Sequence, residues 1–301
     1  LHGLTDWVFR GAYFRHFPGF DAALAPFIAT ARTDRIRKLH FRDLLPERNR
    51  DIRLIPQLLG DDAGGMIQTA RVLVGMGYRE LNWNLGCPHL RVTRKQHGSG
   101  LLPFPDRIDR ILDQVCSLTV ATWSIKLRLG YEEAGEILRL LPVLNRYPLN
   151  GVFLHARVGV QLYRGEVDLD AYAAVAGLCR HELVYNGDIL NLERFAALSR
   201  RFPQQQSWMI GRPAVRDPFL AGEIRGGPFP ADALGRIRSF HDEVYGRYRE
   251  ILSGPVPVLN KMKGIWHFLG DFFRRCGPAA VRLERCHSLE EYEQAVGMIL
   301  S

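Results

Sequence analysis

The sequence lacks any long apolar run. None of its 301 residues belongs to a stretch as long as the roughly 18 uncharged apolar residues that a membrane span needs, and its first residues show no basic segment followed by an apolar one. Cysteine is scarce as well: the five cysteines form no CxxC pair, and their odd number argues against a disulfide framework and a zinc site. We therefore expect a cytoplasmic protein with no membrane partner and no bound metal.

Extreme composition is absent too, which excludes disordered and collagen-like chains. Hydrophobic residues make up 47% of the sequence and charged residues 24%, close to ordinary globular proteins. The charge is not balanced, because 40 lysines and arginines face 32 acids and leave a formal net charge of +8. This excess favours a polyanionic partner without identifying one. We expect the chain to act as a monomer.

Short apolar runs alternate with amphipathic helical patterns over most of the chain, as in proteins built from β/α units. Seven units are predicted, and because Leu4–His16 already has a helical pattern, we expect an eighth strand upstream of Leu1. Eight units form a (β/α)8 TIM barrel, which we favour over a doubly wound sheet because no GxGxxG follows an early strand. The predicted strands are Phe20–Ile28, Ile52–Leu58, Glu80–Leu85, Ala121–Leu127, Gly151–His155, Glu182–Tyr185 and Gln206–Ile210. The predicted helices are Thr33–Leu45, Asp62–Met76, Pro105–Leu118, Glu132–Tyr147, Asp168–Cys179, Asn191–Phe202 and Val215–Arg225.

A second domain follows the predicted barrel. The strand signals stop after the glycine- and proline-rich segment 226–230, and residues 231–301 have helical patterns, with Ser288 and Glu291 spaced as a capping box. We expect a barrel domain over residues 1–228, with its first strand upstream, and a small C-terminal helical domain over residues 231–301. Any binding role of the helical domain depends on how six basic residues are arranged: Lys261, Lys263, Arg274, Arg275, Arg282 and Arg285.

Polar side chains recur at the carboxyl ends of successive predicted strands, where TIM barrels carry their active sites. Any one of them alone is explained by turn chemistry or by a satisfied structural residue. Turn chemistry does not select lysine or histidine inside an apolar run, so their joint occurrence predicts a site at one mouth of the barrel. The residues are Gln57, Asn84, Lys126, His155, Asn186 and Arg212, with Arg128, Arg157, Gly187, Asp188 and Gly211 beside them.

Two glycine turns, a cysteine and a lysine indicate the chemistry of this site. The turns 186–187 and 211–212 follow the last two strands, where barrels of this kind often bind phosphate, so we expect a phosphorylated ligand. Cys87 lies in a Gly-Cys-Pro turn after a strand, where a thiol can give or take a proton. Lys126 could form a Schiff base or act as a fixed cation beside a developing anion, and the residues alone leave both open.

Two further segments are rich in basic residues. The segment 89–100 carries Arg91, Arg94 and Lys95 and ends in glycines, so we expect it to be mobile and to contact phosphates, although a solvated loop would have the same composition. Arg32–Arg53 holds eight basic residues against four acids, which a solvated helix face explains equally well.

Taken together and in this order, several motifs are similar to those of the tRNA-dihydrouridine synthases, over nearly the whole chain. That family's usual Ala-Pro-Met lead-in to the first helix is absent from this sequence. The motifs are GLTD at 3–6 with Arg10, ELNWNLGCP at 80–88, KLRLG at 126–130, HAR at 155–157, NGDI at 186–189 and GR at 211–212.

The resemblance implies an FMN-dependent reduction of the 5,6 double bond of particular uridines in tRNA, with NADPH as the reductant. It implies that Cys87 protonates the uracil as general acid and that Lys126 stands beside the pyrimidine edge of the flavin. It implies a tRNA-binding role for the helical domain. Further implied contacts are those of Gln57, His155, Asn186, Gly187, Asp188, Gly211 and Arg212 with FMN, and of Asn84, Arg128, Arg157, Arg91, Arg94 and Lys95 with the substrate.

Departures from the family pattern keep alternatives open. The family often has Gly-Ala before the leucine that closes the loop after the cysteine, where this chain has Ser99-Gly100 before Leu101, and Val158 replaces a common threonine. The alternatives are another FMN-dependent barrel oxidoreductase that acts on a small molecule, similar to dihydroorotate dehydrogenase; an inactive tRNA-binding protein; and a Schiff-base aldolase. The sequence does not determine which uridine is modified.

Overall fold

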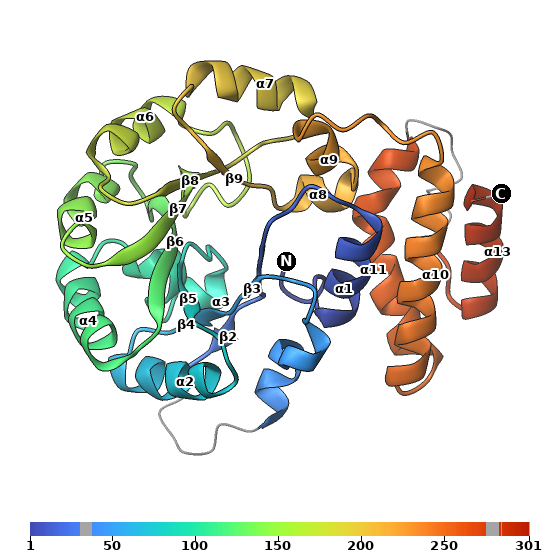
Figure 1. Cartoon of the computed structure of the whole chain (residues 1–301), viewed down its shortest axis with the longest axis horizontal. Helices are drawn as coiled ribbons and strands as arrows, with labels where there is room; N and C mark the ends of the chain where they lie inside the picture. Colours follow the sequence, from blue (N-terminus) through green and yellow to red (C-terminus); the bar gives the residue numbers. More distant parts are fainter. Residues whose placement is uncertain (31–37, 275–282, 284, 301) are drawn as a thin grey trace.

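The computed structural model describes residues 1–30, 38–274, 283 and 285–300 (Figure 1). Seven parallel strands form one sheet in the order β2-β4-β5-β6-β7-β8-β9, and helices lie outside it, as in a β/α barrel. The eighth strand expected upstream of Leu1 stays a prediction. The strands are β1 (Ala23–Leu24), β2 (Ile28–Ala29), β3 (Leu54–Ile55), β4 (Gln57–Leu59), β5 (Glu80–Leu85), β6 (Thr122–Gly130), β7 (Leu149–Val158), β8 (Leu183–Asn186) and β9 (Ser207–Met209).

The first two predicted strands are each divided in two, which corrects the sequence prediction. β1 pairs with β3 in a separate two-stranded sheet, whereas β2 pairs with β4 in the main sheet. Pro26 and Pro56 stand at the two breaks. A proline has no N–H to donate to a sheet, so matching prolines in neighbouring strands interrupt the pairing at the same level.

Local signals set most of the helix starts. The side chains of Asp62, Asp168 and Asn191 each accept a hydrogen bond from a backbone N–H of the first turn, and each lies where the sequence predicts a helix to begin. The α-helices are α1 (Trp7–His16), α2 (Ala63–Gly75), α3 (Leu90–Thr93), α4 (Pro105–Leu118), α5 (Glu136–Leu144), α6 (Leu169–Leu178), α7 (Leu192–Arg201), α8 (Arg212–Arg216), α9 (Leu220–Ile224), α10 (Ala233–Ile251), α11 (Pro255–Arg274) and α13 (Leu289–Leu300).

Two helix predictions are corrected. The range Thr33–Leu45 lies partly outside the described residues, and its described part is the 3₁₀ helix η1 (Lys38–Leu44), followed by η2 (Pro46–Arg48). The range Val215–Arg225 is split between α8 and α9, because Pro218 lies between them and disfavours a helical residue before it.

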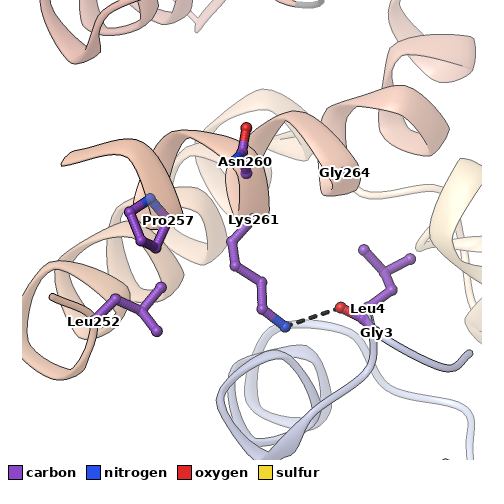
Figure 2. A pocket seen from close by; sticks show the side chains of 7 residues that line it. All are labelled: Gly3, Leu4, Leu252, Pro257, Asn260, Lys261 and Gly264. Carbon is purple, nitrogen blue, oxygen red and sulfur yellow. Dashed lines mark hydrogen bonds between the residues drawn. The ribbon is translucent and has the colours of Figure 1, made fainter. Parts of the chain in front are cut away.

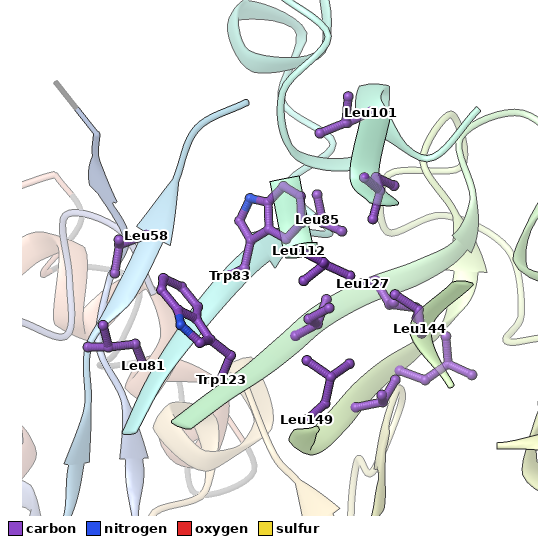
Figure 3. Close-up of a cluster of buried hydrophobic side chains, with 14 of the residues drawn as sticks. Leu58, Leu81, Trp83, Leu85, Leu101, Leu112, Trp123, Leu127, Leu144 and Leu149 are labelled. Carbon is purple, nitrogen blue, oxygen red and sulfur yellow. The ribbon is translucent and has the colours of Figure 1, made fainter. Parts of the chain in front are cut away.

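The main hydrophobic core lies between the sheet and its helices. On β5, Trp83 and its apolar neighbours point outward and pack against Trp123 of β6 and Leu112 of α4, as Figure 3 shows. Side chains alternate along a strand, so Asn82 and Asn84 point to the opposite face, toward the barrel interior, and both are buried. This alternation puts polar groups inside the barrel.

A second core joins the first helix to the C-terminal helices. Buried residues of α1 and α8 pack with those of α10, α11 and α13. Asp6, which caps α1, also accepts hydrogen bonds from Tyr248 Oη at 2.8 Å and Lys261 Nζ at 2.7 Å. Figure 2 shows Lys261 reaching Gly3 across a pocket between these segments. The N-terminal helix is thereby attached to the C-terminal bundle.

The predicted capping box at the start of α13 is confirmed in its first half, since Ser288 Oγ accepts from the N–H of Glu291. The reciprocal bond differs, because the Glu291 carboxylate accepts from the N–H of His287 in place of that of Ser288. In the described part of the chain, no helix combines the length and the apolar character needed to cross a membrane.

Candidate functional site

The parallel register brings the polar strand residues to one region of the barrel. Asn84 of β5 pairs with Lys126 of β6, and His155 of β7 pairs with Arg128 on one side and Asn186 on the other. Gln57 lies at the start of β4, one strand away. Parallel strands present their carboxyl ends at the same edge, so residues 60 positions apart, such as Lys126 and Asn186, become neighbours.

The turn that carries Cys87 is fixed from two sides. Asn84 Oδ1 accepts hydrogen bonds from the backbone N–H groups of Gly86 at 3.1 Å and Cys87 at 2.9 Å. The Cys87 carbonyl accepts from the Ser99 N–H at 3.1 Å and from Ser99 Oγ at 3.2 Å. Ser99 belongs to the 3₁₀ helix η3 (Gly98–Leu101). Its hydroxyl makes a contact with the Cys87 carbonyl that an alanine at this position could not make.

Burial governs the protonation of the Cys87 thiol. The side chain is half-buried, and desolvation raises the pKa of the thiol above its usual value of 9.0, although Arg128 and Lys126 oppose this shift. The thiol is therefore protonated at neutral pH. A protonated thiol held in a fixed turn can donate a proton.

The surroundings of Lys126 disfavour the charged form of its amine. Its Nζ donates to Asn186 Oδ1 at 3.0 Å, and Asn186 Nδ2 donates to the Met209 carbonyl at 2.9 Å. Burial, together with the nearby Arg128, lowers the pKa of Lys126 to about 8. A positive charge is disfavoured here until an anion compensates it, which suits a site for a ligand that carries or develops negative charge.

His155 is neutral in this environment. Burial lowers the pKa of the imidazole far below its usual value, and the cations Lys126, Arg128, Arg157 and Arg212 lower it further. Its Nε2 lies 3.5 Å from Arg157 Nη1. A neutral histidine can exchange hydrogen bonds with a ligand without adding to the local positive charge.

Arg157, near the end of β7, and Asp188, in the turn after β8, form a two-pronged ion pair. The Nη1–Oδ1 and Nη2–Oδ2 distances are 2.8 and 2.6 Å, and Arg157 Nη2 also donates to the Gly165 carbonyl at 2.5 Å. The Arg157 side chain is buried, and its hydrogen bonds to Asp188 and Gly165 occupy much of the donor capacity of the guanidinium. Contact of Arg157 with a substrate stays a prediction.

The turn at 187–188 adopts unusual backbone angles. Gly187 has φ +140° and Asp188 has φ +42°, and a Cβ on Gly187 would lie 2.8 Å from Val167 Cγ1. Only glycine fits at this position. At Gly211, by contrast, nothing lies within 4 Å of the Cβ position, so the backbone before α8 is open to a ligand.

Tyr163, which sequence reasoning missed, lies beside two of the predicted arginines. Tyr163 is 50% exposed, and the guanidinium carbons of Arg212 and Arg128 lie 4.0 and 5.2 Å from its ring centroid. Arg128 itself is buried and donates to the Gly86 carbonyl at 3.0 Å. No spacing rule marks Tyr163, because it lies in the segment after β7 whereas the two arginines belong to β6 and α8.

The basic loop is folded against the barrel. Arg91, Arg94 and Lys95 are exposed on α3 and the turn after it, while His97 Nε2 lies 2.9 Å from Asp61 Oδ1. Arg107 Nη2 contacts the same carboxylate at 2.7 Å, so Asp61 anchors the loop. The mobility of this loop stays a prediction.

The basic residues of the C-terminal helices do not form one described surface. Lys261 Nζ and Lys263 Nζ donate to protein oxygens, Arg285 is exposed, and Arg275 and Arg282 lie outside the described residues, as does the side chain of Arg274. Within the described ranges, no cluster of three or more histidine, cysteine or acidic side chains could hold a metal ion.

The chain is similar in sequence to known proteins. A family model described as "Dihydrouridine synthase (Dus)" matches residues 2–232. The chain is 26% identical over 305 residues to "tRNA-dihydrouridine synthase B" of Vibrio cholerae, covering 98% of this chain and 86% of that protein. It is 32% identical over 205 residues to "Probable tRNA-dihydrouridine synthase" of Rhodobacter capsulatus, covering 65% and 61%.

A solved structure bears on the fold. The old yellow enzyme homologue from Zymomonas mobilis is similar with a TM-score of 0.52 at 11% identity, covering 79% of this chain and 87% of that one. At this identity the likeness concerns the fold alone. It confirms the predicted TIM-barrel class, with helices following the barrel in this chain.

Proposed function

The chain belongs to the dihydrouridine synthase family, and from this premise we propose that it reduces particular uridines in tRNA to dihydrouridine, with FMN as cofactor and NADPH as reductant. The observation that carries the proposal is the Cys87 thiol, kept protonated by burial and held by Asn84 and Ser99 in the region of Lys126. Because tRNA is the substrate, we also propose a cytoplasmic location, and we propose a monomer.

The residues at the mouth of the barrel fit a flavin phosphate and its ring. Three features suit a phosphate: the open backbone at Gly211, the turn at Gly187 and the Arg212 guanidinium. Asn186 and Asp188 flank Gly187 in that turn. Lys126 and Gln57 would hold the ring, with His155 beside it. When bound, FMN supplies the hydride.

The chain's own residues would then handle the proton and the substrate. Cys87 would donate its proton to the uracil carbon next to the one that receives hydride, so that one C–H bond forms from each source. Lys126 would stabilise the negative charge that accompanies reduction. Asn84, Arg128 and Arg157 would orient the uracil, directly or through the loops that they hold.

The target base lies in folded RNA and must leave its stack to reach the site. The exposed residues Arg91, Arg94 and Lys95 would contact the phosphate backbone around it, as the net charge of +8 favours. We propose residues 1–228 as the catalytic barrel domain and residues 231–301 as the tRNA-binding helical domain.

The proposal is tested by cofactor release and by reoxidation. Protein denatured after purification should release a compound with flavin absorbance, and the reduced protein should be reoxidised by unmodified tRNA under nitrogen. Flavin without a response to tRNA would instead indicate a reductase of small molecules. Absence of flavin after addition of FMN would leave a Schiff-base aldolase, detected by borohydride trapping at Lys126, or a binding protein without activity.

A further inference from the structure

A continuous chain of buried side-chain hydrogen bonds runs from β6 to the Cys87 turn. Ser124 Oγ accepts from Asn82 Nδ2 at 3.0 Å, and Asn82 Oδ1 accepts from Gln57 Nε2 at 2.8 Å. Gln57 Oε1 accepts from Asn84 Nδ2 at 2.7 Å, and Asn84 Oδ1 accepts from the Cys87 N–H at 2.9 Å. All four of these side-chain partners are 6% exposed or less.

The strand register builds this chain. Gln57 of β4 pairs with Asn82 of β5, and Asn82 pairs with Ser124 of β6, so three neighbouring strands place polar side chains at one level. Asn84 lies two residues further along β5, on the same face. Each buried amide would be costly without its partners, which makes the chain of contacts interdependent.

The two ends of the chain fix the direction of every bond in it. A backbone N–H can only donate, so Asn84 must turn its oxygen toward Cys87 and its nitrogen toward Gln57. At the other end, Ser124 Oγ donates its hydrogen to the Leu81 carbonyl at 3.3 Å, because a carbonyl can only accept. The lone pairs of Ser124 Oγ therefore face Asn82. Only one orientation of the three amides satisfies both ends.

We propose that Asn82 and Ser124, which lie behind the site, are positioning residues that act through Gln57 and Asn84 to hold the Cys87 thiol where it donates its proton. This inference rests on the proposed function, because it concerns the proton donor of that reaction. It assigns a role in the reaction to two residues outside the set of proposed ligand contacts.

The test compares Ser124→Ala with Thr69→Ala. Ser124→Ala removes the acceptor of Asn82, whereas Thr69→Ala removes an equally buried hydroxyl that donates to the Gly65 carbonyl in α2, away from the site. Ser124→Thr keeps the hydroxyl, and Asn82→Leu breaks the chain at a second point. Four quantities are measured: flavin content, tRNA affinity, single-turnover reoxidation by tRNA, and iodoacetamide alkylation of the Cys87 peptide by mass spectrometry.

We expect Ser124→Ala and Asn82→Leu to slow reoxidation by tRNA about tenfold, while flavin content and tRNA affinity stay unchanged. Alkylation of Cys87 should speed up about threefold, because the loosened turn exposes the thiol more often. Ser124→Thr should restore both values, and Thr69→Ala should change neither.

Unchanged alkylation in both variants would overturn the proposal, as would a loss of flavin that accounts for the slower reaction. Alkylation is measured without tRNA or reductant, so it decides whether the chain holds Cys87 even if the native protein fails to react with tRNA. That failure would count against the proposed function, whereas failure of the alkylation experiment alone would count against the positioning role.

Discussion

Arg157 and Asp188 are 31 positions apart, yet their side chains meet in two parallel hydrogen bonds of 2.8 and 2.6 Å that join the end of β7 to the turn after β8. The pair does more than neutralise a charge, because Asp188 follows Gly187 in the strained turn that we propose for phosphate binding. The position of that turn therefore depends on a residue of the neighbouring strand.

Asp188→Asn should weaken both the fold and flavin binding. The buried guanidinium loses its counter-charge, and because Asp188 is partly exposed we expect a loss of about 2 kcal/mol in the free energy of unfolding. Urea unfolding and titration with FMN measure the two effects. The control is Asp170→Asn, whose partner Arg201 lies on the surface, and it should cost less than about 0.5 kcal/mol.

Cys87→Ala should separate binding from chemistry. We expect normal flavin content and tRNA affinity, with product formation lowered by about 100-fold or more, because a positioned general acid contributes at least that much. Dihydrouridine in tRNA is quantified after incubation with NADPH. Cys116→Ala, which removes a half-buried thiol on α4, is the matched control. Equal activity of the two variants would remove Cys87 from the acid role.

Lys126 should make stability depend on pH in the absence of ligand. Its pKa is lowered from 10.5 to about 8 on folding, so the folded protein binds fewer protons than the unfolded chain between these values, and stability rises with pH across that window. The difference in unfolding free energy between the native protein and Lys126→Met should shift by about 3 kcal/mol in favour of the native protein from pH 8 to 10.5. A constant difference would show that Lys126 is not desolvated.

Gly98 and Ser99 make different contributions to the Cys87 turn. Gly98 has φ +56°, and a Cβ there would lie 2.6 Å from the Cys87 carbonyl oxygen, so Gly98→Ala should displace Cys87 and abolish most product formation. Ser99→Ala loses one hydroxyl contact but keeps the backbone bond, so it should cost about 1 kcal/mol of stability and change activity by less than about threefold. Paired activity and urea-unfolding measurements check this contrast, and an equally active Gly98→Ala would contradict it.

Local sequence signals were sufficient for much of the fold. The helix Pro105–Leu118 is observed at its predicted bounds, since proline at a helix start and apolar periodicity both act within a few residues. The strands Glu80–Leu85 and Glu182–Tyr185 are found within one residue of their predicted ends, because strand periodicity is also local. The positions of Cys87, Lys126 and His155 after or within such strands predicted a shared site for the same reason.

The sequence by itself determined the alternation of β/α units, the helix caps and the polar groups at the strand ends, because these depend on neighbours along the chain. Only the tertiary structure decided which polar groups contact one another: the register that aligns Asn82 with Gln57 and Ser124, the pairing of Arg157 with Asp188, and the packing of α1 against the C-terminal helices. These contacts join segments far apart in sequence. Their partners are selected by strand register, burial and hydrogen-bond direction, which exist only once the chain is folded.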